Sequence, residues 1–258
     1  MQIKFRQWWQ PLLIISILML AGCASLSANN LKDVSSTDAS NEVSANQTII
    51  VTNSQENNLA RLEGKATVLM VVNGSSITIE VDGTNAPITA GNFIDLVQRG
   101  VYEGLAFHRV VREPQPFVVQ GGDPQSKNPN FPVARLGTGG FMDPETSNQR
   151  YIPLEITPKG AEEPIYSQTF DRLGGNKQPA LKHTRGALAM ARSNVPDSAS
   201  SQFYFALTDL PFLDGNYAVF GYVTEGMDVV DGIQQGDRIE SVRVVEGLDN
   251  LKNSPGSN

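Results

Sequence analysis

The pattern of apolar and polar residues predicts a β-hairpin early in the folded part of the chain. Residues 66–72 form a mainly apolar run, and Ile77, Ile79 and Val81 then alternate with polar residues. Asn73-Gly74 lies between the two runs, and this pair suits a two-residue turn because both of its positions need a positive φ. We therefore expect two adjacent antiparallel strands with one buried face.

Short runs of β-branched and aromatic residues continue along the chain, with turn residues between them. Such runs are typical of strands. They occur at residues 107–111, 117–119, 151–156, 187–191, 202–207, 218–223 and 239–245. A chain with so many short strands is predicted to be mostly β and to form a closed antiparallel barrel.

Two segments repeat their apolar residues at helical spacing instead. In residues 87–99, Phe93 and Leu96 fall on one helical face, and Thr89 is the expected N-cap. A shorter helix is expected at residues 227–234. Both segments are brief, so the barrel remains the main element of the predicted fold.

The N-terminal segment, residues 1–22, has the features of a targeting signal. Lys4 and Arg6 precede an apolar core that is too short to span a membrane, and small residues lead to Cys23. This ending resembles the bacterial lipoprotein signal, in which the cysteine becomes the lipidated first residue. The alternative is a plain secretory signal with an incidental cysteine. We expect an extracytoplasmic protein, lipid-anchored to a bacterial membrane on its periplasmic or outward face.

The rest of the chain divides into three parts by composition. Residues 23–58 are rich in Ser and Asn and are predicted to form a flexible tether after the lipidated cysteine. Residues 59–247 are the predicted folded domain, with a Gly-, Pro- and Asn-rich loop system at 124–182. Residues 248–258 are polar, and we expect them to be disordered.

Composition excludes several classes of protein. The net charge of −7 argues against a nucleic acid partner. The single cysteine excludes an intramolecular disulfide, and two histidines are too few for a histidine-rich metal site. The acidic residues show no metal-ligand spacing, so we expect neither a metal nor another cofactor.

One cation interrupts an otherwise apolar predicted strand. Arg109 lies within residues 107–111, and Gln120 follows the next strand, before Gly121-Gly122-Asp123. A buried guanidinium needs a partner, and the carbonyl of a glutamine can accept from it without neutralising it. The alternative is an arginine that extends into solvent from an edge strand.

These residues carry a resemblance to a known family. The stretch FHR…F-x-x-QGGD is followed by LKHT-x-GALAMA, SSQF and FLDG…VFG in the same order. Over roughly residues 64–247 the chain resembles cyclophilin-type peptidyl-prolyl cis-trans isomerases. The resemblance implies a closed barrel of eight antiparallel strands with a helix at each end. It also implies acceleration of rotation about Xaa-Pro bonds in polypeptides.

The chemistry that the resemblance implies needs no nucleophile, because no bond is broken. Rotation about a prolyl peptide bond passes through a twisted state about 18–20 kcal/mol higher in free energy. Twisting ends the amide resonance, so the prolyl nitrogen becomes a better hydrogen-bond acceptor. A cation placed beside that nitrogen binds the twisted state better than the planar one. Arg109 is the candidate for this role, and Gln120 for orienting it.

The remaining site residues are carried over from family positions. The predicted proline pocket and substrate-binding set contains His108, Phe117, Val118, Ala191, Arg192, Gln202, Tyr204, Phe212, Leu213 and Tyr217. Without the resemblance, the apolar members would be interpreted as ordinary barrel core, and Gln202 as a strand residue that satisfies a loop. His108 follows strand alternation to the face opposite Arg109, which favours a structural role although the family places it at the edge of the site.

Several positions depart from the usual family pattern. The best-studied eukaryotic members have Trp at the position of Phe212 and His at that of Tyr217, so cyclosporin is expected to bind weakly. Many members have Met at the position of Val118, and Phe is usual at that of Tyr204. Many also have Asn at the position of Arg192, which leaves a side-chain contact there open.

The sequence thus predicts a monomeric, lipid-anchored prolyl isomerase that acts on proline-containing polypeptides. Two rivals remain. The first is a binding module or chaperone that recognises proline segments on the same fold without turnover. The second is a ligand-carrying lipoprotein barrel, which would need a deep apolar lumen.

Overall fold

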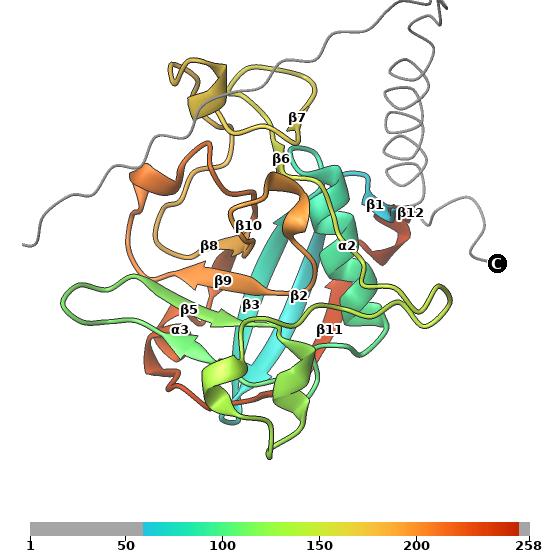
Figure 1. Cartoon of the computed structure of the whole chain (residues 1–258), viewed down its shortest axis with the longest axis vertical. Coiled ribbons are helices and arrows are strands. Elements are labelled where there is room, and N and C mark those ends of the chain that lie inside the picture. The colour runs from blue at the N-terminus through green and yellow to red at the C-terminus, as the bar shows by residue number, and fades with distance from the viewer. Residues whose placement is uncertain (1–58, 253–258) are drawn as a thin grey trace, which may run out of the picture. The chain divides into compact units, whose positions relative to one another are not determined.

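A computed structural model describes residues 59–252 of the chain. Within them, eight strands form one antiparallel sheet in the order β11-β2-β3-β10-β8-β9-β5-β4 (Figure 1). These strands are β2 (Lys65–Val72), β3 (Ser75–Asp82), β4 (Arg109–Val110), β5 (Val118–Gly121), β8 (Ala187–Met190), β9 (Phe203–Ala206), β10 (Val219–Glu225) and β11 (Ile239–Glu246). The mostly β antiparallel fold and its eight strands are as predicted.

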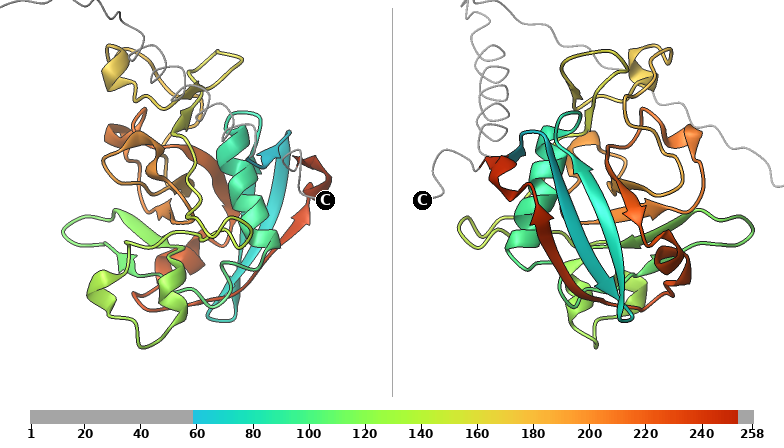
Figure 2. Two further views of the ribbon diagram at one scale, coloured as in Figure 1. Left: turned by 45° about the vertical axis from the view of Figure 1, so that its right-hand side comes forward. Right: turned by 180° about the vertical axis from the view of Figure 1, so that it is seen from behind.

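The hairpin predicted from the apolar pattern is confirmed. β2 and β3 pair along their whole length, from Lys65 with Asp82 to Val72 with Ser75. Asn73 and Gly74 form the turn at φ angles of 51° and 71°, which is why this residue pair is suited to it. Seen from behind, β11 lies beside this hairpin as the outer strand of the sheet (Figure 2).

The predicted closure of the barrel is wrong. The sheet curls into a half-barrel, and its edge strands β4 and β11 share no ladder. Contact between these two edges is limited to one antiparallel bridge, between Ala106 and Arg238, and main-chain hydrogen bonds between residues 104–107 and 236–239. β4 has only two residues, so it is too short to extend this contact into a ladder with β11.

Among the described residues, two α-helices accompany the sheet: α2 (Pro87–Gln98) and α3 (Met227–Gly232). Thr89 is not the N-cap of α2. The N-cap is Ala86, which has no capping side chain, and Pro87 follows it at the first helical position. The carboxylate of Glu155 accepts hydrogen bonds from the N–H groups of Ile88 at 3.0 Å and Thr89 at 2.7 Å instead. A buried acid 66 residues further along thus caps the helix.

The remaining strands are short pairs outside the main sheet. β6 (Glu155–Ile156) pairs with β7 (Ile165–Tyr166), so the strand expected at 151–156 is confined to its last two residues. β1 (Arg61–Leu62) pairs with β12 (Leu251–Lys252). Residues 248–252 are therefore ordered rather than frayed, and the fold extends beyond the predicted boundary at 247. The predicted signal, Cys23 and the whole predicted tether lie outside the described residues, as do residues 253–258 of the predicted tail.

Short 3₁₀ helices shape the connections. They cover Pro124–Lys127, Val133–Arg135, Asp171–Leu173, Pro196–Ser198, Pro211–Leu213 and Leu248–Asn250. Three of them lie in the predicted loop system at 124–182. No helix in the described part of the chain is both long and apolar enough to cross a bilayer.

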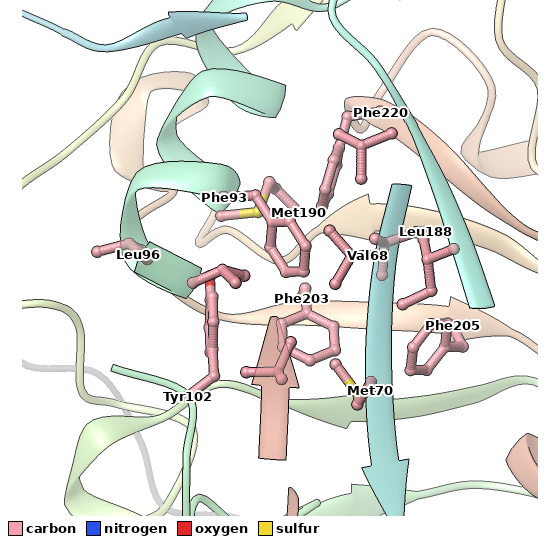
Figure 3. Close-up of a cluster of buried hydrophobic side chains, with 14 of the residues drawn as sticks. Val68, Met70, Phe93, Leu96, Tyr102, Leu188, Met190, Phe203, Phe205 and Phe220 are labelled. Carbon is pink, nitrogen blue, oxygen red and sulfur yellow. The ribbon is translucent and has the colours of Figure 1, made fainter. Parts of the chain in front are cut away.

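The core fills the space between α2 and the concave face of the sheet (Figure 3). Phe93 of α2 lies 5.6 Å, centroid to centroid, from Phe203, which also meets Tyr102 edge-on at 5.3 Å. Phe205 and Phe220 are fully buried in the same cluster. Aromatic side chains thus occupy the interior where the ligand-carrier alternative expects a lumen.

Candidate active site

The register of the sheet places four residues in one row across its convex face. Arg109 on β4 pairs with Gln120 on β5, Gln120 with Tyr204 on β9, and Tyr204 with Ala189 on β8. Directly paired residues present their side chains on the same face. Their neighbours along each strand, such as Val119, Phe203 and Phe205, belong to the core on the other face. Strand alternation therefore separates the site from the core.

A chain of hydrogen bonds starts in this row at Arg109 and leaves it at Gln120. Arg109 Nη1 donates to Gln120 Oε1 at 3.2 Å, and Gln120 Nε2 donates to Gln202 Oε1 at 3.1 Å. Gln202 Nε2 then donates to the carbonyl of Gly139 at 2.7 Å. A guanidinium has only donors, so its bond fixes the orientation of the Gln120 amide, and that amide fixes Gln202.

The guanidinium of Arg109 stays charged but is held in place. The side chain is exposed, as the edge-strand alternative expects. Its Cζ nevertheless lies 5.4 Å from the centroid of the Phe117 ring, a cation–π geometry. Its hydrogen-bond partner Gln120 is neutral, and no carboxylate among residues 59–252 lies within 4.0 Å of it. The positive charge is therefore available to a ligand.

A cavity of about 340 Å³ opens beside Arg109. Nine of the predicted site residues line it: Arg109, Phe117, Val118, Gln120, Ala191, Arg192, Tyr204, Leu213 and Tyr217. Gln202 lines an adjoining cavity of about 380 Å³. The volume lies within the range of small-ligand sites, and the floor is apolar or aromatic.

Two predicted residues, Phe212 and His108, line neither of these two cavities. Phe212 is 65% exposed, and its ring stacks on that of Phe117 at 6.1 Å. His108 is buried, and both its ring nitrogens lack a hydrogen-bond partner. Burial lowers the pKa of His108 below its ordinary value, which favours a neutral imidazole. Its burial beside the exposed Arg109 matches the alternation expected from the sequence.

Tyr204, on the cavity floor, is held from behind by a polar pair. The Tyr204 hydroxyl lies 3.0 Å from His183 Nε2, and His183 Nδ1 lies 2.9 Å from Asp214 Oδ1. Burial lowers the pKa of His183, although Asp214 opposes the shift. The hydroxyl that distinguishes Tyr204 from the usual phenylalanine is thus satisfied inside the protein. Only the phenol ring has to face the cavity.

A buried carboxylate shapes the loop that ends the hydrogen-bond chain. Asp123 Oδ2 accepts from the N–H of Gly137 at 2.6 Å and of Gly139 at 3.2 Å, and Oδ1 accepts from Gln125. A Cβ at Gly139 would collide with Asp123 Oδ1, so the position requires glycine. Sequence reasoning missed this role. The signal was Asp-Pro at the start of a helical turn, where the acid caps the first N–H groups.

The described residues contain no group of three or more His, Cys, Asp or Glu side chains arranged to hold a metal ion. The site therefore offers a fixed cation, two oriented amides and an apolar hollow. That set suits binding of a polar main chain next to a small apolar ring.

Comparison with known proteins identifies the family. Residues 67–252 match the model of the cyclophilin type peptidyl-prolyl cis-trans isomerase family. The chain belongs to this family, because the match covers most of its length.

Named relatives agree with the assignment. The chain is 43% identical over 207 residues to a thylakoid lumen protein of Synechocystis sp. that carries the isomerase name, covering 76% of this chain and 51% of that one. It is 39% identical over 214 residues to a chloroplastic peptidyl-prolyl cis-trans isomerase of Arabidopsis thaliana, covering 76% and 46%. The chain thus spans about half the length of these two relatives. A Helicobacter pylori peptidyl-prolyl cis-trans isomerase is 37% identical over 172 residues, covering 66% and 82%.

Among solved structures, the fold is similar to a Cryptosporidium parvum cyclophilin type peptidyl-prolyl cis-trans isomerase. The TM-score is 0.53 at 23% sequence identity, covering 70% of this chain and 98% of that one. At this identity the likeness concerns the fold alone.

Proposed function

We propose that the protein is a peptidyl-prolyl cis-trans isomerase that acts on extracytoplasmic polypeptides. One observation carries the proposal: a charged guanidinium, held by a neutral glutamine, stands at the rim of an apolar cavity. A Cryptosporidium parvum relative was crystallised in the presence of the dipeptide Ala-Pro, which is consistent with a proline site on this fold.

In the proposed mechanism, the proline ring of the substrate enters the cavity over Tyr204 and Val118. Arg109 donates a hydrogen bond to the prolyl nitrogen as the peptide bond twists. The planar amide nitrogen is a poor acceptor, so this bond strengthens only on the way to the twisted state. No bond to the substrate is made or broken. Gln120 keeps the guanidinium aimed at the nitrogen without removing its charge.

The energies required are modest. Uncatalysed rotation takes about 10–100 s, and a millisecond turnover needs about 5.5–7 kcal/mol of transition-state stabilisation. A well-placed donor in comparable electrostatic sites supplies about 2.7–4 kcal/mol. Water exclusion around the ring by Phe117, Leu213 and Tyr217 supplies the remainder.

The test is turnover of a proline tetrapeptide by the full-length chain in detergent, with wild type and Arg109→Ala compared. We expect Arg109→Ala to lose about 10²–10³-fold in kcat/KM while its melting temperature stays unchanged, because the side chain is exposed. Arg243→Ala is the matched control, since this arginine is exposed on β11, at the other edge of the sheet. Full activity in Arg109→Ala would refute the mechanism.

A binding measurement on the same peptide, added to the turnover assay, separates the enzyme from a non-catalytic binding module. A binding module would take up the peptide, detectable by chemical-shift changes, without raising the isomerisation rate above background. Wild-type protein that binds but does not turn over would therefore overturn the enzyme proposal and favour the module.

The proposed location rests on the N-terminal residues and on the relatives. Small residues precede Cys23 after an apolar segment, and the Synechocystis sp. and Arabidopsis thaliana relatives bear lumenal and chloroplastic names. We expect Cys23 to carry the lipid anchor. Cys23→Ser should move the protein from the membrane to the soluble fraction of the producing cell. Unchanged fractionation, together with an unmodified Cys23 by mass spectrometry, would reject the anchor.

A further inference from the structure

Arg192 is a second unneutralised cation at the proposed active site. Its Nε and Nη2 donate to the carbonyl of Asn216 at 3.0 and 2.6 Å, and its Nη1 donates to that of Ser193 at 2.8 Å. Its Cζ lies 4.6 Å from the centroid of the Tyr217 ring. Carbonyl groups and an aromatic ring hold a guanidinium without cancelling its charge. No carboxylate among residues 59–252 forms an ion pair with it.

Arg192 stands where two cavities meet. It lines the proline cavity, and it also lines the adjoining cavity of about 380 Å³. Gln120 and Ala191 are the other residues that the two cavities share. The rest of the second wall is largely amide and hydroxyl, including Thr138, Gln149, Ser193, Ser198 and Ser200. Of the described residues that line this second cavity, Arg192 alone is charged.

The direction of the substrate chain follows from the chain of hydrogen bonds between Arg109, Gln120 and Gln202. In the proposed function, on which this inference rests, the prolyl nitrogen faces Arg109. The residues that precede the proline are attached through that nitrogen. Arg109 is hydrogen-bonded to Gln120, and Gln120 to Gln202. Both glutamines line the second cavity, so this cavity lies on the Gln120 side of Arg109. The side chain one or two residues before the proline is therefore the one that reaches the polar cavity.

We propose that Arg192 makes the site selective for substrates with an acidic residue one or two positions before the proline. A carboxylate there would complete the ion pair that the protein itself leaves unmade. The guanidinium is already fixed by three hydrogen bonds and a ring, so pairing costs little additional side-chain entropy. A lysine at the same substrate position would meet a like charge.

The test compares peptides that differ at one position. Two sets of three peptides, with Glu, Gln or Lys at the first residue before the proline in one set and at the second residue in the other, are assayed for kcat/KM with the full-length protein in detergent. We expect the order Glu above Gln above Lys at one of the two positions. The Glu-to-Gln ratio should be about fivefold at low salt and should shrink as ionic strength rises.

Variants assign the preference to the side chain. Arg192→Gln should bring the Glu-to-Gln ratio to about one, and Arg192→Lys should keep part of it, because the charge remains. Arg243→Gln, at the far edge of the sheet, should keep the wild-type ratio. Thermal melting of each variant shows whether it folds, and the ratio within one variant is independent of the amount of active protein.

The outcomes separate this inference from the proposed function. Turnover of all six peptides, with equal kcat/KM for Glu, Gln and Lys at each position, overturns the charge preference and leaves the isomerase proposal intact. If no peptide is turned over, the isomerase proposal fails, and titration calorimetry of the same peptides decides the preference. Glu peptides that bind about fivefold more tightly would then still support it, and equal dissociation constants would overturn it.

Discussion

The two faces of β8 and β9 differ although the same strands form both. On the concave face, Phe203 and Phe205 meet edge-to-face at 5.7 Å and fill the core. On the convex face, Tyr204 has Ala187, Ala189 and Ala206 as neighbours in a second cluster. Large side chains close one face, and small ones leave a hollow on the other. One run of alternating residues can thus encode stability on one side and a binding cavity on the other.

The largest expected effect comes from breaking the concave face. Phe203→Ala removes a fully buried ring that contacts Phe93, Tyr102 and Phe205, and should lower the free energy of unfolding by about 3–5 kcal/mol. Urea denaturation measures it. Phe212→Ala is the control, because that ring is 65% exposed and its loss should cost less than about 1 kcal/mol. Equal losses in the free energy of unfolding for the two variants would contradict the assignment of stability to the concave face.

A smaller effect is expected from changing charge on the convex face while keeping shape. Gln120→Glu puts a carboxylate against the Arg109 guanidinium and removes the donor to Gln202. We expect kcat/KM on a neutral peptide to fall about tenfold, less than removal of the guanidinium itself would cause. Retained kcat/KM would show that the charge of Arg109 does not act on the prolyl nitrogen. Urea denaturation of the same variant checks that the fold is kept.

Removal of the Tyr204 hydroxyl should affect stability more than catalysis. Tyr204→Phe keeps the ring in the cavity but leaves His183 Nε2 buried without its partner at 3.0 Å. We expect a loss of about 1 kcal/mol in the free energy of unfolding, and less than a twofold change in kcat/KM. A large fall in kcat/KM with unchanged stability would instead place the hydroxyl in contact with the substrate.

The smallest expected effect is a pH dependence of stability. Burial lowers the pKa of His108 and of His183 below the ordinary 6.5. The unfolded chain then binds protons at a higher pH than the folded one. The contribution of these two histidines to the free energy of unfolding should therefore be level above about pH 6.5 and fall as the pH drops below it. Burial raises the pKa of Glu155, so the contribution of that buried acid has the opposite slope. Denaturation at pH 7.5, 6.5 and 5.5 measures the slope. His108→Gln should lose less stability between pH 7.5 and pH 5.5 than the wild type, and an equal or larger loss would contradict the expectation.

Local patterns in the sequence were enough for much of the fold. Asn73-Gly74 determines a hairpin between two strands that are adjacent in the sequence. Runs of apolar residues predict the positions of most of the other strands. The site residues Arg109, Gln120 and Tyr204 could be predicted because the family resemblance marked their positions. Without it, Val118 and Tyr204 would have been assigned to the core, since burial alone does not tell one face from the other.

Features that depend on distant residues were not predictable in this way. The cap of α2 comes from Glu155, far along the chain, so the nearby Thr89 was a plausible but wrong choice. The loop around Gly139 depends on Asp123, and the contacts of Arg192 depend on the main chain of Asn216. The pairing of β1 with β12 involves two residues on each side, too few for any periodic signal.

The chain of hydrogen bonds from Arg109 to Gly139 determines which sequence changes the active site tolerates. Its last acceptor is a main-chain carbonyl in a loop, so it is lost only when the backbone moves, as it would if a side chain at Gly139 collided with Asp123. A deletion or insertion beside Gly139 would also remove it, because it would shift the carbonyl away from Gln202. Both the length of this loop and the glycine at 139 are therefore constrained, and variants with redesigned loops must supply a new acceptor at the same place.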